Sequence, residues 1–156
     1  MSRDLSEEHL AKLLNGQLTS GSGAAMDDAD IRYKKFLIEC KRRDNNSHNI
    51  VFYPKFWNKL IKQAIKHYKL PAYCYITEDE YFIFIDKTLA FQLYKKWIIY
   101  KAPYKGKVNY NISLEDYDRY YHGLKRKAKE DQEIGIIINN WMLITVHTFK
   151  RITNDL

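Results

Sequence analysis

A carboxylate and an ammonium group lie two residues apart in a segment typical of a buried strand, Phe36-Leu37-Ile38-Glu39-Cys40-Lys41. Alternate side chains of a strand point to the same face, so Glu39 and Lys41 project together while Cys40 points the other way. Asp30 lies nine residues before Glu39, and an adjacent strand would bring its carboxylate within reach of Glu39. Two acids beside a lysine predict a site for a hard cation, with the Cys40 carbonyl as a further oxygen ligand.

This arrangement of charges meets the needs of phosphodiester cleavage. That reaction requires an activated water, neutralisation of the negative charge on the nonbridging oxygens and help for the departing oxygen. Asp30 and Glu39 would hold the metal, while Lys41 would orient the water and stabilise the developing negative charge. The residues also fit a structural interpretation, in which Glu39 and Lys41 form a surface ion pair and Asp30 belongs to a turn. Both interpretations stay open on these residues alone.

The elements that must position these residues follow from periodicity and caps. Asp4 with Glu7 three residues later predicts the cap of a helix over about 6–14, which Asn15-Gly16 ends. Small residues in 17–28 predict a flexible loop. Residues 29–33 and 35–40 are expected to be two strands around a Tyr33-Lys34 turn.

A second helix is the strongest signal in the chain. Apolar residues recur at helical spacing from Pro54 to Tyr68, and Pro71 lies just beyond the end. Residues 72–76 and 81–85 then predict an antiparallel hairpin.

The remaining segment predicts a helical and hairpin region. Thr88 could cap a helix over 89–100, although residues 97–100 are rich in strand formers. Residues 114–128 predict an exposed helix. Residues 134–138 and 141–146 predict a hairpin across Asn139-Asn140, a pair that tolerates positive φ.

The chain carries a net charge of +7 on 156 residues, and the excess is unevenly placed. Ten basic and two acidic residues fall within 31–68, and five lysines with no acid fall within 93–107. Basic blocks interleaved with aromatic residues indicate a phosphate-backbone binder, although a solubilising lysine-rich surface has the same composition. The candidate backbone contacts are Arg42, Arg43, Lys55, Lys59, Lys62 and Lys66.

Several classes of protein are excluded by composition. The apolar runs are too short for a membrane-spanning helix, and the polar start does not resemble a secretory signal, so we expect an intracellular, cytoplasmic protein that sits with the nucleoid or in a host cytoplasm. Two cysteines are too few for a disulfide framework, and the five histidines lack the spacing of a zinc site. A length of 156 residues with 46% hydrophobic content suits one domain over 1–156.

With these segments in order, the region from Glu8 to about Ile85 resembles the PD-(D/E)XK nuclease superfamily. Within this superfamily, the region resembles the small phage and archaeal Holliday-junction-resolvase-like endonucleases. The resemblance rests on an ordered set of segments, namely residues 8–16, 20–24, 28–31 and 36–41, then Ser47, the helix running into Gln63-Ala64, and Pro71 followed by a strand.

The resemblance implies an α/β, restriction-endonuclease-like αβββαβ core with a mixed central sheet flanked by helices. The core would span about 4–86, and residues 87–156 would form a C-terminal helical and hairpin extension. Carried over residue by residue, the catalytic positions fall on Glu8, Asp30, Glu39 and Lys41, around Mg²⁺ or Mn²⁺ held by the three carboxylates. Asp28 is a rival to Asp30, and Glu7 is a rival to Glu8.

The activity implied is metal-dependent hydrolysis of DNA phosphodiester bonds, selective for branched DNA such as four-way junctions and leaving a 5′-phosphate and a 3′-hydroxyl. Symmetric resolution of a junction needs two active sites, so a homodimer is expected with that substrate. Two alternatives stay open: a non-catalytic nucleic-acid-binding module of the same fold, and a restriction-like or flap-cleaving nuclease of the same superfamily.

Overall fold

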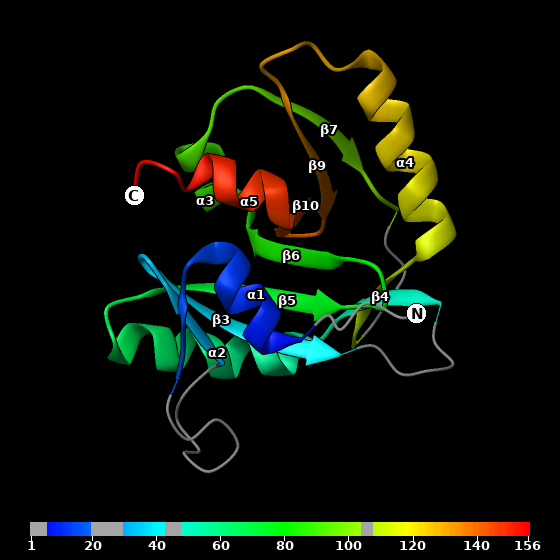
Figure 1. Ribbon diagram of the computed structural model, residues 1–156. Coiled ribbons are helices and arrows are strands. Elements are labelled where there is room, and N and C mark those ends of the chain that lie inside the picture. Colours follow the sequence, from blue (N-terminus) through cyan, green and yellow to red (C-terminus); the bar gives the residue numbers. More distant parts are fainter. Residues whose placement is uncertain (1–5, 20–29, 43–47, 104–107) are drawn as a thin grey trace.

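The computed structural model describes residues 6–19, 30–42, 48–103 and 108–156, and it contains a mixed central sheet with helices on both faces (Figure 1). The strands of this sheet lie in the spatial order β1 (Gln17–Leu18), β2 (Ile31–Tyr33), β3 (Phe36–Arg42), β5 (Leu70–Ile76), β6 (Tyr81–Asp86), β10 (Trp141–Thr145), β9 (Glu133–Ile138) and β7 (Trp97–Lys101). A small second sheet pairs β4 (Asn49–Phe52) with β8 (Tyr110–Ser113). The helices are α1 (Glu7–Leu14), α2 (Pro54–Lys66), α3 (Lys87–Leu93), α4 (Leu114–Lys127) and α5 (Val146–Ile152).

In the first half of the chain, helix α1 is followed by strands β1 to β4, helix α2 and strand β5. Strands β1, β2 and β3 pair antiparallel, whereas β3 and β5 are parallel and α2 makes the crossover that a parallel pair requires. Strand β4 is an addition between β3 and α2, and it pairs in the second sheet. The predicted fold class, an α/β protein with a mixed central sheet flanked by helices, is confirmed.

Two hydrophobic layers enclose the central sheet. On one face, Ile38, Cys40 and Cys74 pack with α1, α3 and α5. On the other face, Leu37 and Tyr73 pack with α2, α4 and the small sheet. Neighbouring residues of β3 therefore face opposite layers, as a strand buried on both sides requires.

Helix α2 and two hairpins form where the sequence predicts them. Pro54 begins α2, whose buried face carries Trp57, Leu60 and Ala64. Strands β5 and β6 pair antiparallel, and so do β9 and β10, with Asn139 at φ 52° in the turn between the second pair. The predicted turn at Asn139-Asn140 is confirmed.

Two expectations for local structure are wrong, and one is confirmed. Ser6, rather than Asp4, caps α1, because its side chain accepts a hydrogen bond from the His9 N–H. Residues 17–18, expected in a loop, pair with β2 as strand β1. Ser113 caps α4, whose predicted extent is confirmed.

The predicted helix over 89–100 is also wrong in its second half and in its cap. Asp86, rather than Thr88, accepts the N-cap hydrogen bond, and α3 ends at Leu93. The Trp97 indole N–H then donates to the carbonyl of Tyr94 at 2.9 Å, and residues 97–101 pair with β9 as a parallel strand. The strand-forming residues here gain a sheet partner, which outweighs their helical periodicity.

The segment after residue 86 completes the central sheet. Strand β10 lies between β6 and β9, so three of the strands in the sheet come from residues 97–145. Strand β8 and helix α5 in this part of the chain were not expected from the sequence. Within the part of the chain that the structure describes, no helix has the length and apolar character to cross a membrane.

Candidate active site at the end of strand β3

The carboxyl-terminal half of β3 presents an acid and a lysine on one face. Glu39 Oε1 lies 3.4 Å from Lys41 Nζ, and the two side chains keep 22% and 30% of their surface exposed. The first turn of α2 brings Phe56 beneath the lysine, whose Nζ lies 3.8 Å from the ring centroid. The ring fixes where the ammonium group sits through a cation–π contact, and it leaves the N–H groups free for other partners.

Asp30 lies beside this pair because it continues the pairing of β2 with β3. Its N–H donates to the Ile38 carbonyl at 3.0 Å, and its Oδ2 accepts a hydrogen bond from the Cys40 N–H at 2.7 Å. Burial raises the pKa of Asp30 despite the Cys40 N–H and the Lys41 charge, which lower it. Burial and then the Asp30 charge raise the pKa of Glu39, so the two carboxylates interact electrostatically.

A tyrosine fixes the first turn of α1 against strand β6. The Tyr81 hydroxyl donates to the Ser6 carbonyl at 3.0 Å and lies 3.2 Å from the Ser6 N–H and 2.8 Å from His9 Nδ1. The hydroxyl proton serves the Ser6 carbonyl, and the hydroxyl oxygen accepts from the Ser6 N–H. These contacts determine which residue of the turn faces the end of β3.

Glu7, rather than Glu8, is the helix glutamate that the fold brings to this group. Burial and then the Asp30 charge raise the pKa of Glu7, while Arg42 and Lys41 lower it. Glu8 lies on the exposed side of α1. The sequence left these two residues as rivals, and the structure distinguishes them through the orientation of α1. The rival Asp28 lies outside the described residues.

The three carboxylates have the chemistry of a magnesium site. Glu7, Asp30 and Glu39 form a chain of repelling charges beside Lys41, and a divalent cation would relieve that repulsion. Among the described residues no group of three or more side chains is already placed to ligate one metal ion. Mg²⁺ is commonly held by one or two carboxylates together with water and substrate phosphates, and Asp30 with Glu39 fits that mode.

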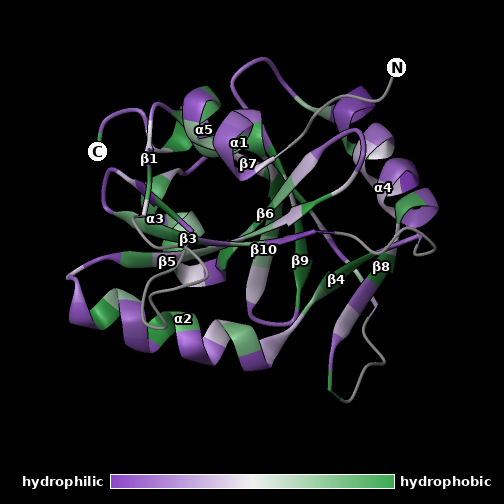
Figure 2. Cartoon of the chain, turned by 60° about the horizontal axis from the view of Figure 1, so that its bottom comes forward, coloured by the Kyte–Doolittle hydropathy of each residue, from purple (hydrophilic) through white to green (hydrophobic). Residues whose placement is uncertain are grey.

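A basic stripe runs from this group along the outer face of α2. Lys55, Lys59, Lys62 and Lys66 are all exposed, at spacings that place them on one side of the helix. Hydrophilic and hydrophobic residues alternate along the ribbon of α2 (Figure 2). Lys59 lowers the pKa of Glu39, so the stripe begins near the carboxylates. Arg42, at the end of β3, is exposed as well, and Arg43 lies outside the described residues.

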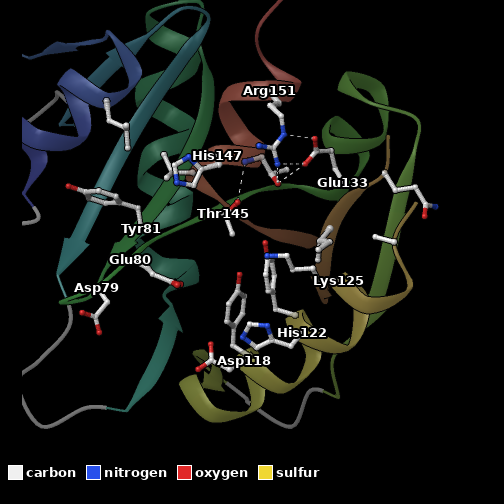
Figure 3. Close-up of a pocket in the computed structure, with 18 of the residues that line it drawn as sticks. Asp79, Glu80, Tyr81, Asp118, His122, Lys125, Glu133, Thr145, His147 and Arg151 are labelled. Atoms are coloured by element: carbon white, nitrogen blue, oxygen red, sulfur yellow. Dashed lines mark hydrogen bonds and ion pairs between the residues drawn. The ribbon is translucent and has the colours of Figure 1, made fainter. Parts of the chain in front are cut away.

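A large cleft lies elsewhere in the described structure, between α1, the β5–β6 turn, α4 and α5 (Figure 3). Its volume is about 820 Å³. Asp30, Glu39 and Lys41 do not line it, whereas His9 of α1 does. Sequence reasoning missed this cleft, because its lining comes from separate segments that share no spacing.

Glu80 in this cleft gives a pH prediction. Burial, Asp118 and Asp79 raise the pKa of Glu80. When the pH rises above the usual pKa range of a glutamate, the folded state therefore holds more protons than the unfolded state, and the stability of the protein falls. Glu80→Gln is expected to remove that fall and to stabilise the protein at pH 7 by under about 1 kcal/mol, a small figure because the side chain is solvent-accessible. Urea unfolding at pH 4 and pH 7 measures the difference between wild type and variant.

The contrasting variant is Asp131→Asn. Lys96 lowers the pKa of Asp131. The negative charge of Asp131 therefore stabilises the folded state at pH values above the usual pKa range of an aspartate, and this stabilisation is lost as the pH falls. The two variants should therefore change the pH profile in opposite directions. A wild-type profile that Glu80→Gln leaves unchanged would show that the Glu80 pKa is not raised.

Comparisons with known proteins give a likeness to solved structures and no matching family. No family model matches the chain, and no curated protein matches it. Among solved structures, the chain is similar to Hjc of Archaeoglobus fulgidus, a Holliday junction resolvase from an archaeal hyperthermophile, with 15% sequence identity and a TM-score of 0.46. The match covers 78% of this chain and 96% of that chain. At this identity and score, the functional assignment rests on the geometry of the chain itself.

Proposed function

We propose that the chain is a divalent-metal-dependent endodeoxyribonuclease that acts on branched DNA such as four-way junctions. The observation that carries this proposal is the gathering of Glu7, Asp30 and Glu39 around Lys41 at the end of β3. Binding alone does not require acids at a phosphate-binding surface, because they repel the DNA backbone. Acids that hold a cation, together with a lysine that faces the phosphate, are the components of phosphodiester hydrolysis.

Each residue has a role that its position supports. Asp30 and Glu39 would hold Mg²⁺ or Mn²⁺, which when bound supplies charge neutralisation for the phosphate and acidity for water. Glu7 would accept hydrogen bonds from water at the edge of the site. Lys41 would orient the attacking water and stabilise the charge that develops on the nonbridging oxygens.

DNA would reach this group along the basic stripe. Exposed lysines contact backbone phosphates without reading sequence, which suits selection by the shape of a substrate. Cutting both sides of a four-way junction calls for two copies of the site, so the proposal includes a homodimer on that substrate. Light scattering of the protein with and without a junction measures the stoichiometry.

The decisive experiment assays one wild-type preparation on matched substrates. End-labelled four-way junctions, flaps, forks and linear duplex are incubated with Mg²⁺, with Mn²⁺ and with EDTA. We expect metal-dependent cleavage, fastest on junctions, with 5′-phosphate ends. Tight binding without cleavage under every metal condition would favour the non-catalytic module, and preferential cutting of flaps or of one duplex sequence would favour another nuclease of the superfamily.

Neutralising two lysines of the stripe should change the salt dependence of DNA binding. Each phosphate contact contributes about 0.9 to the slope of log affinity against log salt, so Lys59→Gln with Lys62→Gln should lower the slope by about 2. Fluorescence anisotropy on a labelled junction measures it. The control is Lys150→Gln, an exposed lysine of α5 on the other face of the sheet. Equal slopes for the wild type and both variants would show that DNA does not bind along the stripe.

Phe56 is a positioning residue for Lys41. Phe56→Leu removes the ring face that lies 3.8 Å from the lysine and should lower kcat by about threefold to tenfold with KM unchanged. Phe56→Tyr keeps the face and should retain wild-type kcat. Single-turnover and steady-state kinetics on the preferred substrate separate kcat from KM. Equal losses in both variants would mean that the ring has only a packing role.

A further inference from the structure

The turn between α2 and β5 holds an aromatic side chain almost wholly in solvent. Tyr68 is 97% exposed, and its side chain makes no hydrogen bond, ion pair or ring contact with any residue that the structure describes. Ile65, three residues earlier, is 69% exposed. The packing of the described residues therefore gives no reason for a large aromatic residue at this position.

The backbone of Tyr68 takes a left-handed conformation that usually belongs to glycine, with φ at 57°. The Tyr68 N–H donates to the Ile65 carbonyl at 3.2 Å. The Lys69 N–H donates to the Ala64 carbonyl at 2.8 Å, and this pair of bonds ends many helices with glycine in the place of the tyrosine. A Cβ atom in this region of φ is unfavourable, and no contact of the ring within the described chain offsets it. Asn15, which ends α1 at the same φ, is by contrast a residue type that tolerates the conformation.

The surroundings of the ring are basic. Residues 54–70 include five lysines and no acidic residue. Lys66 is exposed, and Lys69 lines a pocket of about 370 Å³ together with Arg32 and Lys34. Lys69 Nζ donates to the Lys34 carbonyl at 2.7 Å, which holds its charge beside the turn. Exposed aromatic rings among cations are typical of surfaces that bind nucleic acid strands, where the cations contact phosphates and the rings stack on bases.

Tyr68 lies at the opposite end of α2 from the candidate active site. The Leu70 N–H donates to the Lys35 carbonyl, so the turn lies beside the start of β3, whereas Lys41 lies near its end (Figure 1). The helix from Phe56 to its last residue is roughly 15 Å long. The ring is therefore too far from Lys41 to take part in the chemistry, but a DNA strand that follows the basic stripe would reach it.

We propose that Tyr68 stacks on an unpaired base of bound DNA where the strands separate at a branch point. The inference rests on the proposed function for the presence of branched DNA on the basic stripe, and it assigns the preference for branched DNA to this ring. Lysines contact the phosphates of duplex and branched DNA alike. A base inside a duplex is stacked on its neighbours, whereas an unpaired base offers a free face to an aromatic side chain.

Fluorescence anisotropy in EDTA tests the proposal without cleavage, on a labelled four-way junction and on a linear duplex of equal length. Tyr68→Gly should weaken junction binding by about tenfold and duplex binding by less than about twofold. The dependence of junction affinity on salt should stay unchanged, because no charge is removed. Glycine fits the left-handed conformation, so the melting temperature of the variant should rise by about 2 °C. Tyr68→Phe keeps the ring and should bind as the wild type does.

The matched control is Phe91→Leu, which removes a ring that is 37% exposed on α3, on the other face of the sheet. It should leave both affinities unchanged. Equal junction affinity for Tyr68→Gly and wild type would overturn the inference, and so would equal losses on junction and duplex. A change from dimer to monomer in Tyr68→Gly, measured by sedimentation, would also overturn it, because the ring would then join two copies of the chain.

The same variants separate this inference from the nuclease activity. Junction binding that depends on Tyr68, with no cleavage when Mg²⁺ is added, would support the stacking role and contradict the proposed nuclease. Cleavage by the wild type together with unchanged affinity in Tyr68→Gly would leave the nuclease in place and exclude the stacking role.

Discussion

Asp30→Asn is expected to lower metal-dependent cleavage of branched DNA by about a thousandfold. The variant keeps an oxygen that can accept the Cys40 N–H bond, seen at 2.7 Å, but removes the negative charge that would hold the cation. Loss of a metal-borne charge stabilisation of several kcal/mol corresponds to a rate change of this size. Single-turnover cleavage of a labelled four-way junction measures the rate.

The stability of the same variant separates a catalytic role from a structural one. Because burial raises the pKa of Asp30, the ionised carboxylate opposes folding at neutral pH, and the wild type loses stability as pH rises above the usual range of the group. Asp30→Asn should therefore be at least as stable as wild type at pH 7 while it is nearly inactive. The control Asp131→Asn should cleave at the wild-type rate. A variant that cuts normally, or one that is inactive because it is unfolded, would contradict the assignment.

Glu7→Gln is expected to slow cleavage by about tenfold to a hundredfold, whereas Glu8→Gln should leave the rate unchanged. Glu7 shares an electrostatic environment with Asp30, Lys41 and Arg42, but Glu8 lies on the exposed side of the same turn. The two variants make the same chemical change one residue apart, so each serves as the control for the other. Cleavage rates over a Mg²⁺ titration measure the effect, and Glu7→Gln should need more Mg²⁺ for half-maximal rate.

A larger loss of cleavage rate in Glu8→Gln than in Glu7→Gln would instead identify Glu8 as the catalytic helix glutamate, as the family resemblance implies. Equal, small losses in both variants would remove the helix glutamate from the mechanism and leave Asp30, Glu39 and Lys41 as the site.

The periodic segments of this chain were the predictable ones. Pro54 and the helical spacing after it define α2, and the Asn139-Asn140 turn defines the hairpin of β9 and β10. Alternation along a strand places Glu39 and Lys41 on one face, which their 3.4 Å contact bears out. Where local pattern and tertiary pairing disagree, as at Trp97, the sequence prediction was wrong, because the partner strand β9 lies far along the chain.

The rest of the site depends on contacts that no local pattern contains. The choice between Glu7 and Glu8 rests on the rotation of α1, which the Tyr81 hydroxyl fixes from 75 residues away. The cleft likewise collects side chains from elements at both ends of the chain. Spacing can predict that acids belong together, but only the packed structure determines which neighbour is turned towards the group.

The position of β10 between β6 and β9 has a consequence for synthesis of the protein. Until residues 141–145 have left the ribosome, β6 remains an open edge, and the earlier strands cannot form the finished sheet. Thr153, which follows α5, then joins the end of the chain to the turn after β2. Its Oγ1 lies 2.7 Å from the Tyr33 hydroxyl, and its carbonyl accepts a hydrogen bond from Lys34 at 2.8 Å. A chain that stops short of this point would expose its apolar strands to aggregation, and the carboxylates at β3 would lack the framework that holds them.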